Sequence, residues 1–150
     1  MPDTPPEIRP LGPSEVDAVC RVLGLARLHQ GNGSYLVAWD GDEPTGHAYL
    51  ALTDPPELQD VEVRIPFHRH GIAHRLIAAV EAAAVAQGAD RLRLSVSVGN
   101  QGAQKLYRLL GFVDVGVAPK IVRGTIQIRT GPLELNDTML TWEKRLSSTG

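Results

Sequence analysis

The sequence predicts a mixed α/β fold, with a partly antiparallel central sheet and flanking helices. Three observations carry this prediction. Short segments with a two-residue apolar period recur along the chain, as is typical of half-buried strands. Two early strands are joined by a turn that predicts an antiparallel hairpin. Residues 61–98 have the pattern strand, helix, strand, which predicts a parallel pair with a right-handed crossover.

The first predicted elements are a short strand over residues 7–11 and a helix that begins near residue 14. Gly12 and Pro13 break the strand, and Ser14 followed by Asp17 is a capping pattern for the helix. The apolar face of this helix consists of Val16, Val19, Cys20 and Leu23. Free cysteine is among the most buried residue types, so we expect Cys20 to fill the core.

The hairpin consists of strands at residues 34–39 and 46–52 with a turn at 41–44. The next strand is indicated by apolar residues that alternate with Glu62 and Arg64. The strongest helix covers residues 71–87 and ends at Gly88. The apolar residues at helical spacing along it are Ile72, Leu76, Ile77, Val80, Ala83 and Ala84.

The last third of the chain begins with a predicted strand at 92–98 and a helix at 101–110. Asn100 is a natural N-cap for that helix, and Gly111 closes it. Two further strands follow at 112–117 and 140–146. Residues 118–138 are long for a link between two strands, so we expect an inserted arm or small hairpin there.

The composition and charge argue against several classes of protein. A chain of 150 residues, 43% hydrophobic, predicts one domain over residues 7–146, with flexible ends at 1–6 and 147–150. The net charge of -2 argues against a nucleic-acid partner. One cysteine excludes an internal disulfide and fits the cytoplasm. No segment resembles a signal peptide or approaches the ~20 apolar residues of a membrane span.

Residues 66–73 predict a phosphate-binding turn, because a strand leads directly into a helix there. The first N–H groups of a helix have no internal partner, and the helix dipole adds partial positive charge at that end. Gly71 and Ala73 leave the backbone accessible to a phosphate. The basic side chains around this point are His68, Arg69, His70, His74 and Arg75. Cations oppose the dipole at a helix start, so their presence favours a bound anion.

A plain helix start with solvated basic residues is the alternative interpretation of this junction. A Walker loop is excluded, because Gly71 is not followed by Lys and Ser or Thr. A dinucleotide-binding turn is excluded as well, because no glycine-rich turn with a suitably spaced acidic residue follows the first strand.

Two motifs resemble those of the GNAT acetyltransferases. Residues 68–73 are similar to the pyrophosphate motif Arg/Gln-x-x-Gly-x-Gly/Ala of that family, with His68 in place of the usual Gln or Arg. Residues 100–112 are similar to its Asn-x-x-Ala-x-x-Leu-Tyr-x-x-x-Gly-Phe motif. The two motifs and their strands span residues 61–112. The resemblance implies a GNAT-like sheet in which two neighbouring parallel strands splay apart.

The resemblance implies acetyl-CoA as cosubstrate and no metal. Backbone groups of Val61, Glu62 and Val63 would bind the pantetheine arm, and Asn100 would touch the cofactor at the splay. The residues whose N–H groups would hold the pyrophosphate are Arg69, His70, Gly71, Ile72, Ala73 and His74.

The resemblance also implies that Tyr107 is the general acid near the thioester sulfur. The alternative is a core aromatic that shares a helix face with Ala103 and Leu110. Direct attack of an amine on the thioester needs no covalent enzyme intermediate, so the absence of a nucleophilic cysteine motif is no objection.

The sequence does not identify the general base. Glu62 is the candidate on the cofactor strand, with a surface charge as its alternative and a water relay as the rival mechanism. Glu57 and Asp60 lie just before it, and some relatives carry a carboxylate where this chain has Ser95. His47 faces the acceptor in one interpretation and is exposed in the other.

The sequence therefore predicts an N-acetyltransferase that moves an acetyl group from acetyl-CoA to a primary amine of a small molecule or peptide. A GNAT-like CoA-binding regulatory module without turnover is the alternative. No membrane partner is expected, and a homodimer is possible through edge strands or the arm. Three roles for the arm stay open: acceptor selection, dimerisation or a solvated loop. Its polar residues are Lys120, Arg123, Arg129, Glu134, Asn136 and Asp137.

Overall fold

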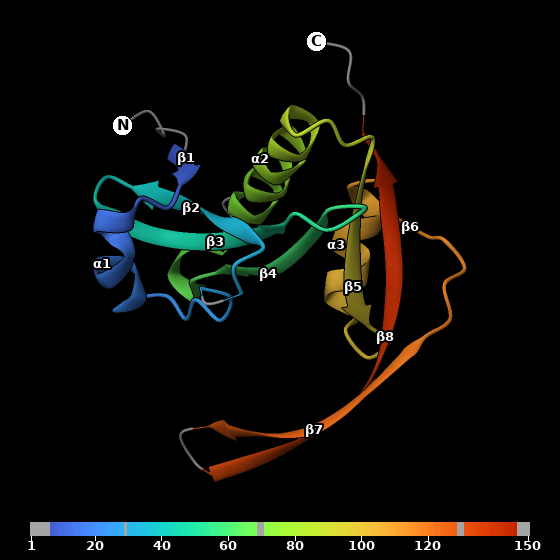
Figure 1. Ribbon diagram of the computed structural model, residues 1–150. Helices are drawn as coiled ribbons and strands as arrows, with labels where there is room; N and C mark the ends of the chain where they lie inside the picture. The colour runs from blue at the N-terminus through green and yellow to red at the C-terminus, as the bar shows by residue number, and fades with distance from the viewer. Residues whose placement is uncertain (1–6, 29, 69–70, 129–130, 147–150) are drawn as a thin grey trace. The chain divides into compact units, whose positions relative to one another are not determined.

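The computed structural model describes residues 7–28, 30–68, 71–128 and 131–146 (Figure 1). The chain divides into two compact units, one of residues 1–92 with 146–150 and the other of residues 93–145. The predicted flexible ends, residues 1–6 and 147–150, lie outside the described residues. The single-domain assignment of residues 7–146 stays a prediction. In the described part of the chain no helix is both long and apolar enough to cross a membrane.

Four antiparallel strands form the sheet of the first unit. β1 (Glu7–Pro10) pairs with β2 (Gly33–Asp40), β2 with β3 (Glu43–Ala51), and β3 with β4 (Glu57–Val63). The turn between β2 and β3 has two residues, and Gly41 adopts there a φ of 63°, which suits glycine. The predicted hairpin is confirmed, with both strands longer than the sequence indicated.

The first helix is shorter than predicted. The 3-10 helix η1 (Pro13–Glu15) leads into α1 (Val16–Cys20). The cap lies at Gly12, whose N–H donates to the Glu15 carboxylate at 3.3 Å, so the predicted cap at Ser14 was wrong. Val19 and Leu23, one turn apart, face the core, whereas Cys20 follows Val19 and points about 100° away from it. Cys20 is therefore exposed, contrary to the prediction that it fills the core.

The strongest predicted helix is confirmed as α2 (Ile72–Ala86), which follows the 3-10 helix η2 (Ile65–Phe67). Gly88, with a φ of 88°, follows its C-cap Gln87, as the predicted stop requires. The side chains that α2 buries are Ile72, Leu76, Ile77, Val80 and Ala84. Their helical spacing explains why the sequence pattern was clear.

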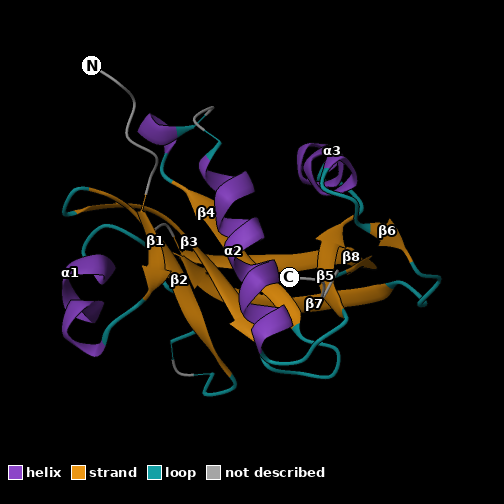
Figure 2. Cartoon of the chain, turned by 90° about the horizontal axis from the view of Figure 1, so that it is seen from above, coloured by secondary structure: helices purple, strands orange, loops and turns teal. Residues whose placement is uncertain are grey.

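The two faces of the first unit's sheet are covered by different helices (Figure 2). Side chains alternate along a strand, so odd-numbered residues of β2 and β3 share one face. That face carries the core cluster Val19, Leu23, Tyr35, Val37, Trp39, Tyr49 and Ala51, which includes α1. The opposite face lies against α2, where Leu76 approaches Gly46. His47 therefore lies on the α1 side of the sheet.

Gly46 allows β3, β4 and α2 to approach closely. A Cβ there would lie 2.8 Å from the Glu62 carbonyl oxygen and 3.2 Å from Cδ1 of Leu76. A backbone oxygen cannot move aside alone, so we expect Gly46→Ala to lower the free energy of unfolding by about 1–3 kcal/mol. Urea denaturation measures this loss. Gly24→Ala is the matched control, since a Cβ at Gly24 meets nothing within 4 Å; equal stabilities of the two variants would contradict the close approach.

β4 contains a bulge opposite the middle of β3. Where β3 has only Ala48, β4 has the two residues Asp60 and Val61. Asp60 adopts a φ of 48°, a left-handed conformation that Asp and Asn tolerate better than most residues. Bulges re-aim side chains and occur often beside active sites. This bulge brings Asp60, together with Glu62, close to His47.

The second unit contains β5 (Arg91–Ser97) from residue 93 onward, α3 (Gln101–Leu109), β6 (Val113–Asp114), β7 (Lys120–Ile128) and β8 (Gly131–Arg145). β8 lies between β5 and β6, and its first part pairs with β7 to form a hairpin arm (Figure 1). The last predicted strand, residues 140–146, is thus only the end of a 15-residue strand. The strand predicted at 112–117 is reduced to two residues, because only those pair with β8.

Polar contacts hold α3 to the end of β5. Gln104 is buried, and its amide donates to the carbonyl oxygens of Ser97 and Val98, both at 3.0 Å. The side-chain oxygen of Asn100 accepts a hydrogen bond from the N–H of Ala103 at 3.0 Å, so the predicted N-cap is confirmed. No pattern in the sequence indicated this role of Gln104.

Candidate functional site

The candidate cofactor site begins where β4 leads through η2 into α2. Gly71 is the N-cap of α2 and adopts a left-handed conformation, with φ 72° and ψ 14°. Such a conformation strains any residue with a Cβ, which explains the glycine. A Cβ placed there would meet nothing within 4 Å, so the helix start leaves room for a ligand.

The charges at the start of α2 favour an anion. The first turn contains no acidic residue, and His74 and Arg75 are exposed there. Ile72 is buried, so it offers only its backbone to a ligand, while Ala73 is half-buried. The predicted contributions of Arg69 and His70 lie outside the described residues. An anion at this point would offset both the helix dipole and the positive charge of Arg75.

His68 turns back toward β4. Its Nε2 lies 2.7 Å from the carbonyl oxygen of Val63, and this nitrogen is the donor because a carbonyl oxygen only accepts. His68 therefore stabilises the connection between β4 and α2. Val61, Glu62 and Val63 lie in β4 as predicted, and their contacts with a pantetheine arm stay a prediction.

Tyr107 lies on α3 in the second unit. Its ring packs edge-on against Phe112, with ring centroids 5.9 Å apart. Burial raises the pKa of the Tyr107 phenol, so the group keeps its proton at neutral pH. The packing agrees with the core-aromatic interpretation. It does not conflict with an acid role, because packing uses the ring and proton transfer uses the hydroxyl group.

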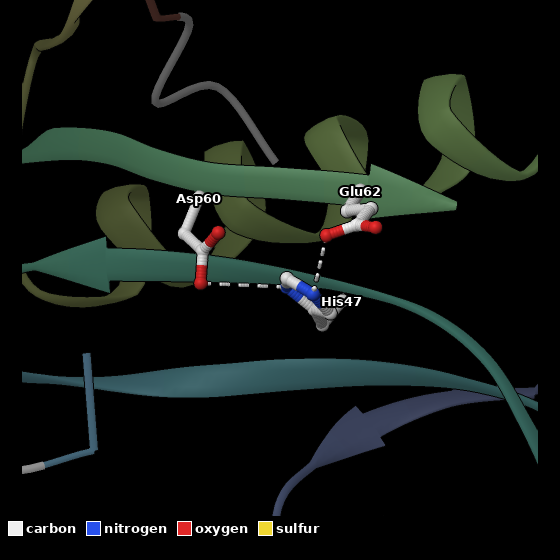
Figure 3. Close-up of side chains that lie close together, drawn as sticks. All are labelled: His47, Asp60 and Glu62. Carbon is white, nitrogen blue, oxygen red and sulfur yellow. Dashed lines mark ion pairs between the residues drawn. The ribbon is translucent and has the colours of Figure 1, made fainter. Parts of the chain in front are cut away.

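A second group of polar side chains lies in the first unit, around His47 (Figure 3). His47 is fully buried, so the interpretation that it is exposed was wrong. Its Nδ1 lies 3.8 Å from Oδ2 of Asp60, and its Nε2 lies 3.6 Å from Oε2 of Glu62. The Asp60 side chain is 19% exposed and that of Glu62 is 63% exposed. Among the described residues neither ring nitrogen has a hydrogen-bond partner.

Asp60 is held in place from the segment that follows α1 and from β2. Its Oδ2 accepts hydrogen bonds from the Tyr35 hydroxyl at 2.5 Å and from the N–H of Ala26 at 3.3 Å. The Tyr35 oxygen in turn accepts from the N–H of Arg27 at 2.8 Å. The Tyr35 ring also packs edge-on against His47. These contacts fix both the carboxylate and the imidazole.

Burial raises the pKa of Tyr35, and the hydrogen bond from its neutral hydroxyl to Asp60 raises it further. A folded-state pKa above the unfolded value stabilises the fold below the ordinary phenol pKa of about 10, and the stabilisation is lost as pH rises through the folded-state pKa.

The absorbance of tyrosinate, followed as the pH is raised, tests this shift in the Tyr35 pKa. While both proteins are folded, the wild type and Tyr35→Phe should give the same tyrosinate absorbance. The wild type should exceed the variant by one tyrosine only after unfolding. One extra tyrosine ionising early in the folded wild type would contradict this.

The sequence indicated His47 and Glu62 separately and missed their association. The available signal was cross-strand pairing, because these two residues are direct partners in the β3–β4 register. Tyr35 was missed altogether. Of the other candidates, the Glu57 carboxylate accepts a hydrogen bond from the Gln59 side chain at 3.3 Å, and Ser95 is exposed on β5.

Residues 4–112 match the family described as the Acetyltransferase (GNAT) family. The match covers both motifs and most of the chain. The chain belongs to the GNAT acetyltransferase family. It is therefore an acyltransferase, as the two motifs predicted.

Solved structures of GNAT acetyltransferases are similar to nearly the whole chain. The ribosomal-protein-S18-alanine N-acetyltransferase from Escherichia coli has a TM-score of 0.71 and 16% identity, with 97% of this chain and 96% of that chain covered. A GNAT family acetyltransferase from Elizabethkingia anophelis with acetyl-CoA bound has a TM-score of 0.70 and 19% identity, with coverage of 94% and 98%. A Bacillus subtilis acetyltransferase in complex with CoA has a TM-score of 0.68 and 19% identity, with coverage of 95% and 100%.

At these identities the likeness concerns the fold. It confirms the predicted mixed α/β class, with a partly antiparallel sheet and flanking helices. No curated protein matches the sequence.

Proposed function

We propose that this GNAT acetyltransferase transfers the acetyl group of acetyl-CoA to a primary amine by direct attack. The start of α2 carries the proposal: a left-handed Gly71 follows β4 and η2, and the first helical turn has no acidic residue. Two of the similar structures contain acetyl-CoA or CoA, which supports this cosubstrate.

The residues present fit acetyl-CoA. The N–H groups at the start of α2 hold the pyrophosphate, in a space that a Cβ at Gly71 would enter. The residues assigned to this cradle are Arg69, His70, Gly71, Ile72, Ala73 and His74. The pantetheine arm bonds to the backbone of Val61, Glu62 and Val63, and Asn100 also contacts the cofactor. When bound, acetyl-CoA supplies an acetyl group activated as a thioester.

Two proton transfers fall to side chains of this protein. A primary amine with a pKa of about 10.4 must lose a proton before it can attack, and Glu62 accepts it. The departing thiolate, whose conjugate thiol has a pKa of about 8.5, takes a proton from the Tyr107 phenol. The phenolate takes up the second proton that the nitrogen loses as the amide forms, which restores the phenol. Burial raises the pKa of Tyr107, so the phenol is protonated when this donation is required.

Turnover tests the proposal directly. Acetyl-CoA is mixed with a panel of alkylamines, polyamines, amino sugars and peptides, and release of free thiol is followed. We expect at least one amine to raise the release above background hydrolysis, with the acetylated product seen by mass spectrometry. Acetyl-CoA binding without release across the panel would favour the alternative, a CoA-binding regulatory module.

The acceptor is a small molecule or a peptide with a free amino group. GNAT enzymes act on both kinds, and one similar structure is named for the alanine of ribosomal protein S18. We place the reaction in the cytoplasm, because an exposed free Cys20 persists best in a reducing compartment. Formation of a homodimer stays a prediction.

A further inference from the structure

We propose that His47, acting through Glu62, takes up the proton that the acceptor's ammonium group must lose, and that Asp60 fixes the His47 ring for this purpose. The inference rests on the proposed acetyl transfer to an amine. Of the two residues, Glu62 is the one that an acceptor can reach, because its side chain is 63% exposed. His47 is fully buried and is a positioning and proton-accepting residue behind it.

Each edge of the His47 ring faces its own carboxylate. Nδ1 is 3.8 Å from Asp60 and Nε2 is 3.6 Å from Glu62, just beyond the ~3.2 Å reach of an N–H···O hydrogen bond. A small movement closes both gaps. When both nitrogens carry hydrogen, the ring can donate to both carboxylates.

A metal ion fits this arrangement less well. His47, Asp60 and Glu62 are common ligand types, and their ligand atoms lie within 4.8 Å of one another. A single ion, however, binds one imidazole nitrogen, whereas the carboxylates here face different nitrogens.

Asp60 sets the tautomer of the neutral His47 ring. The Tyr35 hydroxyl and the Ala26 N–H both donate to Oδ2 of Asp60, so this oxygen is the acceptor in both contacts. An ionised carboxylate only accepts, so the ring proton lies on Nδ1, toward Asp60. The lone pair of Nε2 therefore faces Glu62, where the incoming proton arrives.

The proton moves in two steps. An N–H bond of the ammonium group breaks and an O–H bond forms on Glu62, leaving the electron pair on the amine for attack. That O–H bond then breaks as an N–H bond forms at Nε2 of His47, which restores the Glu62 carboxylate. After transfer the proton returns to solvent through Glu62. An imidazole is a stronger base than a carboxylate by about two pKa units in water, so it holds the proton longer.

Two small acceptors separate this role from a structural one. Ethylamine is an ammonium ion at neutral pH and must lose a proton, whereas hydroxylamine is already neutral. We expect His47→Gln to lower kcat/KM for ethylamine by about 10²-fold and for hydroxylamine by less than about tenfold. Equal losses for both acceptors would overturn the proposal, because misfolding or misplaced groups would affect them alike.

A second variant and an NMR measurement cover the case in which His47→Gln does not fold. Glu62→Gln alters an exposed side chain, so it should fold if His47→Gln does not, and we expect the same selective loss. Long-range ¹H–¹⁵N NMR of the histidine rings reads the tautomer directly. We expect His47 to carry its proton on Nδ1 in the wild type and to lose this preference in Asp60→Asn.

The outcomes separate failure of the proposed acetyl transfer from failure of the proposed role of His47. If the wild type binds acetyl-CoA and acetylates no amine, the proposed function fails, and the NMR tautomer alone decides whether Nε2 is free to accept a proton. A proton on Nε2 in the neutral wild-type ring would overturn the proposal. So would binding of added Zn²⁺ that is lost in His47→Gln, because the cluster would then be a metal site.

Discussion

Replacing Tyr107 with phenylalanine is expected to lower kcat for acetyl transfer by about 10²–10⁴-fold, the usual contribution of a positioned general acid. The variant keeps the ring that packs against Phe112 and removes only the hydroxyl group. Without that group the thiolate must leave unprotonated or take its proton from water. Steady-state kinetics with the best amine of the panel measures the effect.

The control for Tyr107→Phe is acetyl-CoA binding, which should be unchanged together with the melting temperature. A loss of kcat with unchanged affinity then reflects missing chemistry. Full activity in the variant would show that Tyr107 is only a core aromatic. A large drop in melting temperature would show that the hydroxyl group serves the fold.

Replacing Gly71 with aspartate is expected to weaken acetyl-CoA binding by about thirtyfold to a thousandfold. The carboxylate would enter the space beside the start of α2, where the proposed pyrophosphate lies. Two like charges about 4 Å apart near a protein surface repel by up to about 4 kcal/mol, and solvent screening reduces this. Calorimetric titration of each variant measures the change in affinity.

Gly71→Asn is the matched control for this charge. Asn and Asp are similar in size, and both tolerate the left-handed φ of 72° better than other side chains. The two variants therefore share the backbone cost and differ in the negative charge. If Asp and Asn weakened binding equally, the effect would come from strain or bulk, and the pyrophosphate would not lie at Gly71.

Elements with a buried face and local caps could be predicted from the sequence. α2 has a helical row of buried apolar residues and a glycine at each end, and α3 has Asn100 as its cap. The length of residues 118–138 predicted an arm or small hairpin. The bounds of β7 and of the first part of β8, which pair with each other there, could not be predicted. The side chains described on β7, residues 120–125, are exposed, so no buried face imposes a two-residue pattern there.

The residues of the candidate site likewise include some that could be inferred locally and some that could not. Gly71 and Asn100 have roles that depend on their own helix ends, and these could be inferred locally. The cluster of His47, Asp60 and Glu62 depends on the register of β3 with β4 and on the bulge at Asp60. Register and bulge are set by pairing between distant segments. A single sequence has no local pattern that indicates them, so the association of these three residues was missed.

Calorimetric titration of acetyl-CoA into the wild-type protein, with ATP and NAD as competing ligands, tests the cofactor site most directly. We predict one acetyl-CoA bound per chain, with no comparable binding of ATP or NAD. Absence of acetyl-CoA binding, or a preference for either nucleotide, would contradict the assignment of the α2 start as an acetyl-CoA site.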